Sequence, residues 1–174
     1  MTRLKKKLGV APLLAFALVV LVGGAAFARQ QIAKASGGRP EVKVQLSGTV
    51  VREGKALSLD KVESVKPGEV LDWQIVSSND GTGAARDYKA VGHIPAGTQL
   101  VAGSASGEQG SNVTYSVDGG KTFSSQPIIE ERQADGSVKS IPAPVSMYTE
   151  VRYEWSDALA AGGKLSASYR VRVK

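Results

Sequence analysis

An alternation of apolar and polar side chains with a period of two runs through most of this chain and restricts its fold more than any other feature. The alternation is clearest near the C-terminus, where every second residue of 165–173 is apolar and the residues between are serine or arginine. It also marks segments 42–47, 71–75, 113–117 and 151–155. Because successive side chains of a β-strand point to opposite faces, each segment is predicted to be a strand with one face in a core.

Segments that favour turns separate these predicted strands. They contain glycine, proline or asparagine, which supply a positive φ or a preset φ, and they lie at 66–68, 79–81, 95–97, 118–120 and 161–163. No convincing amphipathic helix interrupts the pattern. Residues 41–174 are therefore predicted to form one all-β domain, an antiparallel β-sandwich, with the proline-rich and charged segment 126–145 as a long surface loop.

The first 28 residues have a different composition. A basic segment with Arg3 and 5–7 precedes 20 uncharged, largely apolar residues at 8–27, and the segment ends in Ala26-Phe27-Ala28. This order is typical of a signal peptide cleaved after Ala28, whereas about 20 apolar residues can also span a bilayer as an uncleaved anchor helix. In both cases the positive flank stays inside, so the remaining chain is expected to be periplasmic, on the cell surface or extracellular. Residues 29–40 are predicted to be a flexible tether.

Composition excludes several classes of function. The chain has 22 basic and 16 acidic residues and a net charge of +6, but residues 1–28 hold four basic and no acidic side chains, so the excess in the remaining chain is only two. Nucleic-acid binding, which needs a concentrated basic surface, is not expected. The absence of cysteine excludes disulfides, thiol nucleophiles and a lipid-modified cysteine. His93 is the single histidine, so a metal site with several histidines cannot form and a histidine-containing catalytic triad has only this one candidate. We therefore expect no enzyme, no cofactor and no metal.

Several motifs occur in a characteristic order. Val-Lys-Pro-Gly-Glu-Val-Leu-Asp-Trp at 65–73 is followed by Asn-Asp-Gly at 79–81, His-Ile-Pro-Ala-Gly-Thr at 93–98, Gly-Ser-Ala at 103–105, a segment at 115–123 and Trp155. This order resembles bacterial conserved-repeat domains of the DUF11 type over residues 57–174. The resemblance implies an immunoglobulin-like sandwich of the kind found in cell-surface, adhesin-like and envelope proteins. Those proteins usually carry several repeats, whereas this chain carries a single copy.

Polar motifs that could hold a chemical site have structural interpretations. Residues 116–123 match the Asp-box pattern of sialidase-type propellers, but one copy predicts a hairpin turn closed by the carboxylate of Asp118 rather than a sugar-processing site. Loop oxygens of Asn79, Asp80, Asp87 and Asp118 could bind Ca²⁺, but their spacing matches no EF-hand.

Two further candidates have equally simple interpretations. His93 lies at a predicted strand end and is more readily a surface residue than a general base. Glu130 and Glu131 are adjacent in the sequence, whereas a glycosidase needs two carboxylates that face each other across a cleft.

The outward side of the last predicted hairpin is the candidate interaction face. It would carry a net basic set of side chains, Arg152, Lys164, Arg170 and Arg172, with Lys174, against Glu150 and Glu154. Such a face could bind anionic wall polymer, lipid headgroups or an acidic partner, or it could simply be solvated. The C-terminal strand could instead be a free edge that accepts a neighbour's strand, with 29–40 as the donor.

These observations predict a non-enzymatic exported cell-envelope protein that acts as a structural, adhesion or protein-interaction module. The expected partner is an envelope protein or an anionic wall polymer, with membrane contact only through residues 1–28 if they are not cleaved. The alternative is a carbohydrate- or cell-wall-binding module. Most aromatic residues fall on the inward alternation, which leaves few to stack on sugar rings. A small hydrolase is a weaker hypothesis, because no nucleophile and base pair is recognisable.

Overall fold

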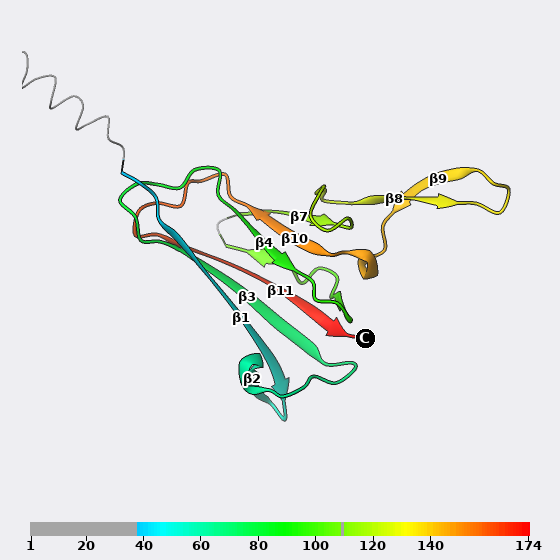
Figure 1. The fold of residues 1–174 in the computed structure, drawn as a ribbon, viewed down its shortest axis with the longest axis horizontal. Coiled ribbons are helices and arrows are strands. Elements are labelled where there is room, and N and C mark those ends of the chain that lie inside the picture. The colour runs from blue at the N-terminus through cyan, green and yellow to red at the C-terminus, as the bar shows by residue number, and fades with distance from the viewer. Residues whose placement is uncertain (1–37, 109) are drawn as a thin grey trace, which may run out of the picture. The chain divides into compact units, whose positions relative to one another are not determined.

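The computed structural model describes residues 38–108 and 110–174 (Figure 1). The predicted signal peptide or anchor at 1–28 and most of the predicted tether lie outside these residues. The compact unit begins at Arg39. Arg39 is held by two hydrogen bonds with Thr82, because its N–H donates to the Thr82 hydroxyl at 3.2 Å and its C=O accepts from the Thr82 N–H at 3.0 Å. The end of the predicted tether is therefore part of the domain.

Residues 39–174 form antiparallel sheets, as the alternation predicts. The larger sheet has the order β2 (Lys55–Ser58), β1 (Val42–Arg52), β3 (Val70–Asn79), β11 (Lys164–Val173) and β5 (Thr98–Leu100), and the short strand β6 (Ser106–Gly107) also pairs with β11. The smaller sheet has the order β4 (Lys89–His93), β10 (Glu150–Glu154) and β7 (Asn112–Ser116). Short 3-10 turns, η1 (Leu59–Lys61) and η2 (Val145–Met147), lie in two of the connections.

The segment 126–145 is not a long loop, contrary to the prediction. It contains a hairpin of β8 (Ile128–Arg132) and β9 (Val138–Pro142) that extends beyond the two sheets (Figure 1). Its turn includes Gly136 with φ of 86°, a conformation that other residues adopt only with strain. Charge and proline obscured the strands at the sequence level, because most side chains of this hairpin are exposed and the alternation of a half-buried strand is missing.

A single core lies between the larger and the smaller sheet. The alternation places apolar side chains of β10 and β11 inside, as predicted, with glutamate and arginine on the outer side of β10 and lysine, serine and arginine on the outer side of β11. Aromatic side chains supply much of this core, since Tyr153, Tyr169 and Trp155 are almost completely buried. The other buried apolar members are Val50, Leu71, Ile75, Ala90, Ile94, Leu100, Val151, Leu159, Leu165, Ala167 and Val171.

Two buried tyrosines join the sheets through their hydroxyls. Tyr153 of the smaller sheet donates to the C=O of Ser168 at 2.7 Å, and Tyr169 of the larger sheet donates to the C=O of His93 at 2.6 Å. Buried hydroxyls need such partners, because an unpaired polar group in a core costs free energy. Burial raises the pKa of both phenols, to about 12 for Tyr169. These two bonds fix how the smaller sheet lies over β11.

Candidate interaction surfaces

The predicted basic face is divided between the two sheets. The prediction that β10 and β11 form a hairpin is wrong, because β10 pairs with β4 and β7 whereas β11 pairs with β3, β5 and β6. Arg152 therefore lies on the outer face of the smaller sheet. Lys164, Arg170 and Arg172 lie on the outer face of β11, in the larger sheet. Of the four basic residues predicted to share one face, Arg152 is therefore separated from the other three.

The outer face of β11 is the more basic of the two. The acidic residues predicted to balance it, Glu150 and Glu154, lie with Arg152 on the other sheet. Acidic neighbours of this face are Asp72 of β3, with its Oδ1 3.9 Å from Nε of Arg170, and Glu108, whose carboxylate accepts from the N–H of Ser166. Arg172 donates to the C=O of Gly68 at 3.2 Å, and its side chain remains exposed. This face can therefore attract an anionic polymer.

Arg152 is held by its neighbours. Its guanidinium lies 2.6 Å from the carboxylate of Glu154 and 4.1 Å from the ring centroid of Phe123. Glu154 also contacts the ammonium of Lys89 at 3.3 Å. The planar guanidinium suits both an ion pair and stacking on an aromatic face. Arg152 thus fastens the 116–123 turn to β10 and is less available to a partner than the arginines of β11.

The Asp-box segment forms the predicted turn. The carboxylate of Asp118 accepts from the backbone N–H groups of Lys121 and Thr122, each at 3.0 Å, and from the hydroxyls of Ser116 and Thr122, each at 2.7 Å. These hydrogen bonds, with the Ser116 hydroxyl first, hold the pKa of Asp118 well below its usual range. Every strong contact of this carboxylate is internal to the turn, so it has a structural role.

The other sequence candidates do not converge on one site. The carboxamide of Asn79 is buried at the end of β3, where it donates to the C=O groups of Gly83 and Leu159 and accepts from the N–H groups of Glu41 and Gly81. Asp80 instead pairs with Lys43 at 2.9 Å. In residues 38–108 and 110–174, no three acidic or histidine side chains are grouped as metal ligands.

His93 and the Glu130–Glu131 pair lie far apart in the topology. His93 ends β4 and contacts the carboxylate of Glu150, with Nδ1 2.9 Å from Oε1. Glu130 and Glu131 are adjacent on β8, where they point to opposite faces of the exposed hairpin. In this arrangement the two carboxylates do not face each other across a substrate cleft.

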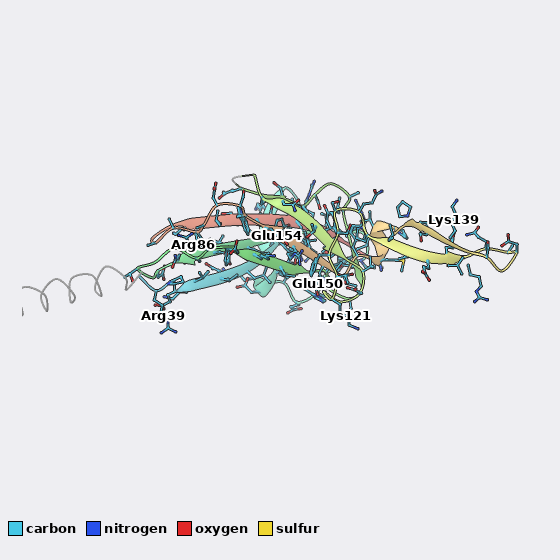
Figure 2. The ribbon with its side chains drawn as sticks, turned by 90° about the horizontal axis from the view of Figure 1, so that it is seen from above. Arg39, Arg86, Lys121, Lys139, Glu150 and Glu154 are labelled. Carbon is cyan, nitrogen blue, oxygen red and sulfur yellow. The ribbon has the colours of Figure 1, made fainter. Side chains whose placement is uncertain are left out.

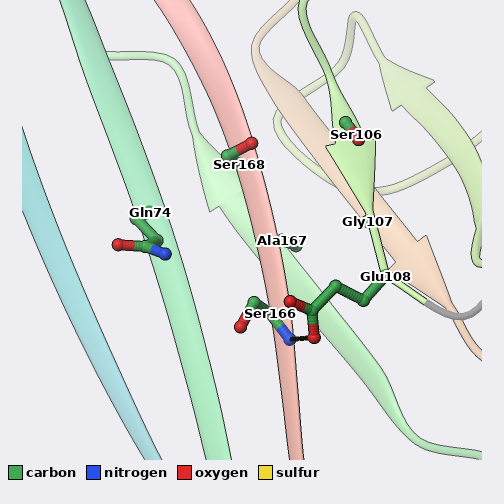
Figure 3. A pocket seen from close by; sticks show the side chains of 7 residues that line it. All are labelled: Gln74, Ser106, Gly107, Glu108, Ser166, Ala167 and Ser168. Carbon is green, nitrogen blue, oxygen red and sulfur yellow. Dashed lines mark hydrogen bonds between the residues drawn. The ribbon is translucent and has the colours of Figure 1, made fainter.

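A polar pocket lies on the outer face of the larger sheet (Figure 3). It has a volume of about 340 Å³ and is lined by Gln74, Ser106, Gly107, Glu108, Ser166, Ala167 and Ser168. The carboxylate of Glu108 accepts a hydrogen bond from the N–H of Ser166 at 3.2 Å. Pairing of β6 with β11 creates this pocket, which no sequence pattern predicts because β6 has only two residues.

The projecting hairpin is a second surface that sequence reasoning missed. Ile128 and Val138 are 65% and 55% exposed, and both lie on the same face of the hairpin. Figure 2 shows Lys139 on this hairpin, well away from Glu150 and Glu154 of the smaller sheet. A two-stranded hairpin in water is at best marginally stable by itself, so its exposed apolar residues suit a contact with a partner.

The N-terminal half of β1 is a third surface, and here the sequence prediction fails. The alternation predicts that Val44 and Leu46 face the core, but they are 59% and 55% exposed. Both lie on the inward-facing side of the larger sheet, because they alternate in register with buried Val50. The smaller sheet has only three strands and does not cover this part of the larger sheet, which leaves an apolar strip at its edge.

The predicted free edge at the C-terminal strand is also corrected. β11 is flanked on one side by β3 and on the other by β5 and β6, so it lies inside the larger sheet. Among the residues that the structure describes, the free edge is instead the segment 42–47 of β1, since β2 pairs with residues 49–52 and Gly48 is buried against Leu59. The order of strands in a sheet depends on long-range pairing, which local alternation does not report.

Comparison of the chain with known protein families, with curated proteins and with solved structures finds no match.

Proposed function

We propose that this chain is a non-enzymatic, exported cell-envelope protein that acts as a structural, adhesion or protein-interaction module. Its domain is an immunoglobulin-like sandwich, in line with the resemblance to the DUF11 type, and it binds through a sheet edge. The observation that carries the proposal is the N-terminal part of the edge of β1, which exposes apolar side chains and is unpaired within the described part of the chain. An exposed edge offers a row of backbone hydrogen-bonding groups that another strand can complete.

The chemistry of the polar groups supports a binding role over a catalytic one. The carboxylates that accept the most hydrogen bonds close turns. Asp118 closes the Asp-box turn, and Glu69 accepts two hydrogen bonds from Arg52, at 2.7 and 2.9 Å, and one from the Lys66 N–H at 2.7 Å. A catalytic site needs a nucleophile and a base within reach of each other and of a substrate, and these carboxylates are already engaged.

Export rests on residues 1–28, whose basic, apolar and small-residue order favours a secretory signal or an anchor. Among the residues that the structure describes, no helix is long and apolar enough to cross a membrane. Membrane contact is proposed only through residues 1–28, if they are not cleaved. The partner is an envelope protein or an anionic wall polymer, and nucleic acid is not expected.

The alternative is a carbohydrate- or cell-wall-binding module, and one feature favours it. The polar pocket at Gln74 and Glu108 adjoins the outer face of β11, which carries Arg170 and Arg172. Hydroxyl, amide and carboxylate groups can form hydrogen bonds with sugars. The neighbouring arginines can attract an anionic polymer to the same surface. None of the residues that line the pocket is aromatic, so the pocket cannot stack a ring on a sugar as many carbohydrate-binding sites do.

Sedimentation with envelope tests the proposal. The full chain is expressed in a bacterium that exports it, purified in its processed form, and centrifuged at high speed alone and with purified envelope. Sedimentation only with envelope supports a binding module, whereas a chain that stays in the supernatant in both tubes contradicts it. Protease treatment of the envelope separates the alternatives, since a protein partner is then lost and a wall polymer is retained.

A further inference from the structure

The outer face of the larger sheet carries an uninterrupted row of small polar side chains. Ser47 of β1 pairs with Gln74 of β3, and Gln74 pairs with Ser168 of β11. Ser168 in turn pairs with Ser106 of β6. Directly paired residues of neighbouring strands point to the same face, and all four side chains are exposed. With about 4.8 Å between neighbouring strands, the row crosses about 14 Å of the sheet.

The polar pocket lies at the β6 end of this row. Gln74, Ser106 and Ser168 of the row line it, and Ser166 and Glu108 complete its polar lining (Figure 3). Of these five side chains, only that of Glu108 forms a hydrogen bond within the described chain. The hydroxyl and carboxamide groups of the others are therefore free to bind a ligand in the hollow of about 340 Å³.

Glu108 is held in place by the strand and the core beside it. Its backbone N–H donates to the C=O of Ser166 at 2.9 Å, and its C=O accepts from the indole N–H of buried Trp155 at 2.8 Å. Its side chain extends across β11, where the carboxylate oxygen Oε2 accepts from the N–H of Ser166 at 3.2 Å (Figure 3). The other oxygen, Oε1, is left for a ligand and is positioned before the ligand binds, which lowers the cost of ordering on binding.

The charge in the pocket discriminates between classes of ligand. Glu108 is the one charged side chain among the described residues that line it, and the row itself is uncharged. The carboxylate would repel an anion, whereas a ligand hydroxyl can donate to Oε1. The nearest basic residues of β11 are Lys164 and Arg170, and Arg170 has Asp72 opposite it. The pocket therefore suits an uncharged ligand with many hydroxyl groups.

The free groups of the pocket match the groups of a sugar. Serine hydroxyls both donate and accept, the carboxamide of Gln74 offers two N–H donors and one acceptor, and the carboxylate of Glu108 accepts. None of the described residues that line the pocket is aromatic, so binding depends on hydrogen bonds. Those to the charged acceptor Glu108 are expected to be roughly twice as strong as neutral ones.

We propose that the pocket and the row beside it bind an uncharged glycan. Hydroxyl groups of one sugar unit donate to Glu108, and further units lie along the row towards Ser47. This inference rests on the binding role proposed above and names a ligand for it, but it assigns the contact to the outer face of the larger sheet and not to the edge of β1. A chain of sugars can contact the whole row, so a polymer should bind more tightly than a single sugar.

Sedimentation with protease-treated envelope tests this ligand, because the treatment removes protein partners and retains glycan. The full chain, exported and purified in its processed form, is centrifuged with this envelope at about 0.1 M and about 1 M salt. The higher salt shortens the screening length to about 3 Å, so binding to an anionic polymer falls steeply. Binding to an uncharged glycan should be the same at both. Oxidation of the envelope with periodate, which cleaves the vicinal diols of sugars, should abolish sedimentation.

Variants of the pocket have opposite effects on the two classes of ligand. Glu108→Gln removes the charged acceptor and should weaken glycan binding at least about tenfold, whereas the loss of a negative charge would strengthen the binding of an anionic polymer. Ser168→Arg fills the pocket and adds a positive charge, so it should block a glycan and favour an anion.

Asp72→Asn is the matched control. It removes a carboxylate from the same face of the sheet but outside the pocket, so glycan binding should be unchanged. Glu108 and Ser168 are exposed, so both pocket variants should keep the circular dichroism spectrum and the Tm of the wild type, which separates loss of binding from loss of fold.

Three results would overturn the inference. They are sedimentation with protease-treated envelope at low salt only, sedimentation that survives periodate, and a folded Glu108→Gln chain that sediments as well as the wild type or better. Untreated envelope keeps this result apart from the proposed function. A chain that sediments with untreated envelope but not after protease treatment refutes the glycan and leaves a protein partner, and one that sediments with neither refutes both.

Discussion

Gly92 of β4 has no room for a side chain, so Gly92→Ala should destabilise the domain strongly. The aromatic ring of Tyr169 crosses from the larger sheet and lies against Gly92, where a Cβ would come within 2.9 Å of Cζ and closer still to Cε1. The ring cannot move outward easily. It is almost completely buried, and its hydroxyl is fixed by the 2.6 Å bond to the C=O of His93, the next residue on β4.

The expected cost follows from overpacking. Forcing an additional carbon into a well-packed core costs about 1–3 kcal/mol, and straining the buried Tyr169 hydrogen bond adds about 1 kcal/mol. We expect a loss of about 3 kcal/mol in the free energy of unfolding, or roughly 10 °C in Tm for a domain of this size. Val91→Ala is the control, because Val91 is an exposed neighbour on the same strand, and it should change stability by less than about 0.5 kcal/mol.

Urea unfolding followed by tryptophan fluorescence and circular dichroism measures both variants. Tyr169→Leu removes the obstructing ring, so a double-mutant cycle with Gly92→Ala should show that the double variant is less destabilised than the sum of the single variants, by about 1 kcal/mol or more. A Gly92→Ala protein with the Tm of the wild type would refute this packing. Strict additivity in the cycle would show that the cost of Gly92→Ala does not come from the Tyr169 ring.

Three further outcomes are expected. Hydrogen bonds from Arg52 and from the N–H of Lys66 lower the pKa of Glu69 to about 2. Because the pKa of this carboxyl is lower in the folded protein than in the unfolded one, it stabilises the fold above pH 4.5, and this stabilisation is lost as the pH falls towards 2. Urea midpoints should decline less over that range in Glu69→Gln. Asp118→Asn should lower Tm without abolishing envelope sedimentation, and a fully folded variant that no longer sediments would contradict a structural role for this carboxylate. If the partner is an anionic polymer, reversing both Arg170 and Arg172 to Glu should weaken sedimentation several-fold, and equal weakening by a charge reversal elsewhere on the surface would argue against a specific face.

Local patterns predicted the all-β class, the antiparallel strands and the inward residues of the C-terminal strands. They succeeded because a strand with one face in a core and one in water must alternate, as Tyr153 and Tyr169 do against the polar residues between them. The Asp-box turn was equally predictable, since the groups that close it lie within a few residues of Asp118. The strands of the β8–β9 hairpin were missed because neither of its faces is well buried.

The predicted interaction face failed for a different reason. Arg152, Arg170 and Arg172 were expected together because β10 and β11 follow each other in the sequence and each alternates correctly. Which strand pairs with which depends on contacts between distant segments, and here the chain crosses from one sheet to the other after Glu154. Sequence spacing therefore placed the side chains on the correct faces of their strands but on the wrong sheets.

The sequence alone thus determined which side of each strand is apolar, where the turns fall and which chemistries the composition excludes. Tertiary structure decided whether an apolar side is covered. Val44 and Tyr169 obey the same alternation, yet one is exposed and the other is buried, because the smaller sheet lies over β11 and does not reach the N-terminal half of β1. Burial is a property of two surfaces, and the second surface comes from residues far away in the chain.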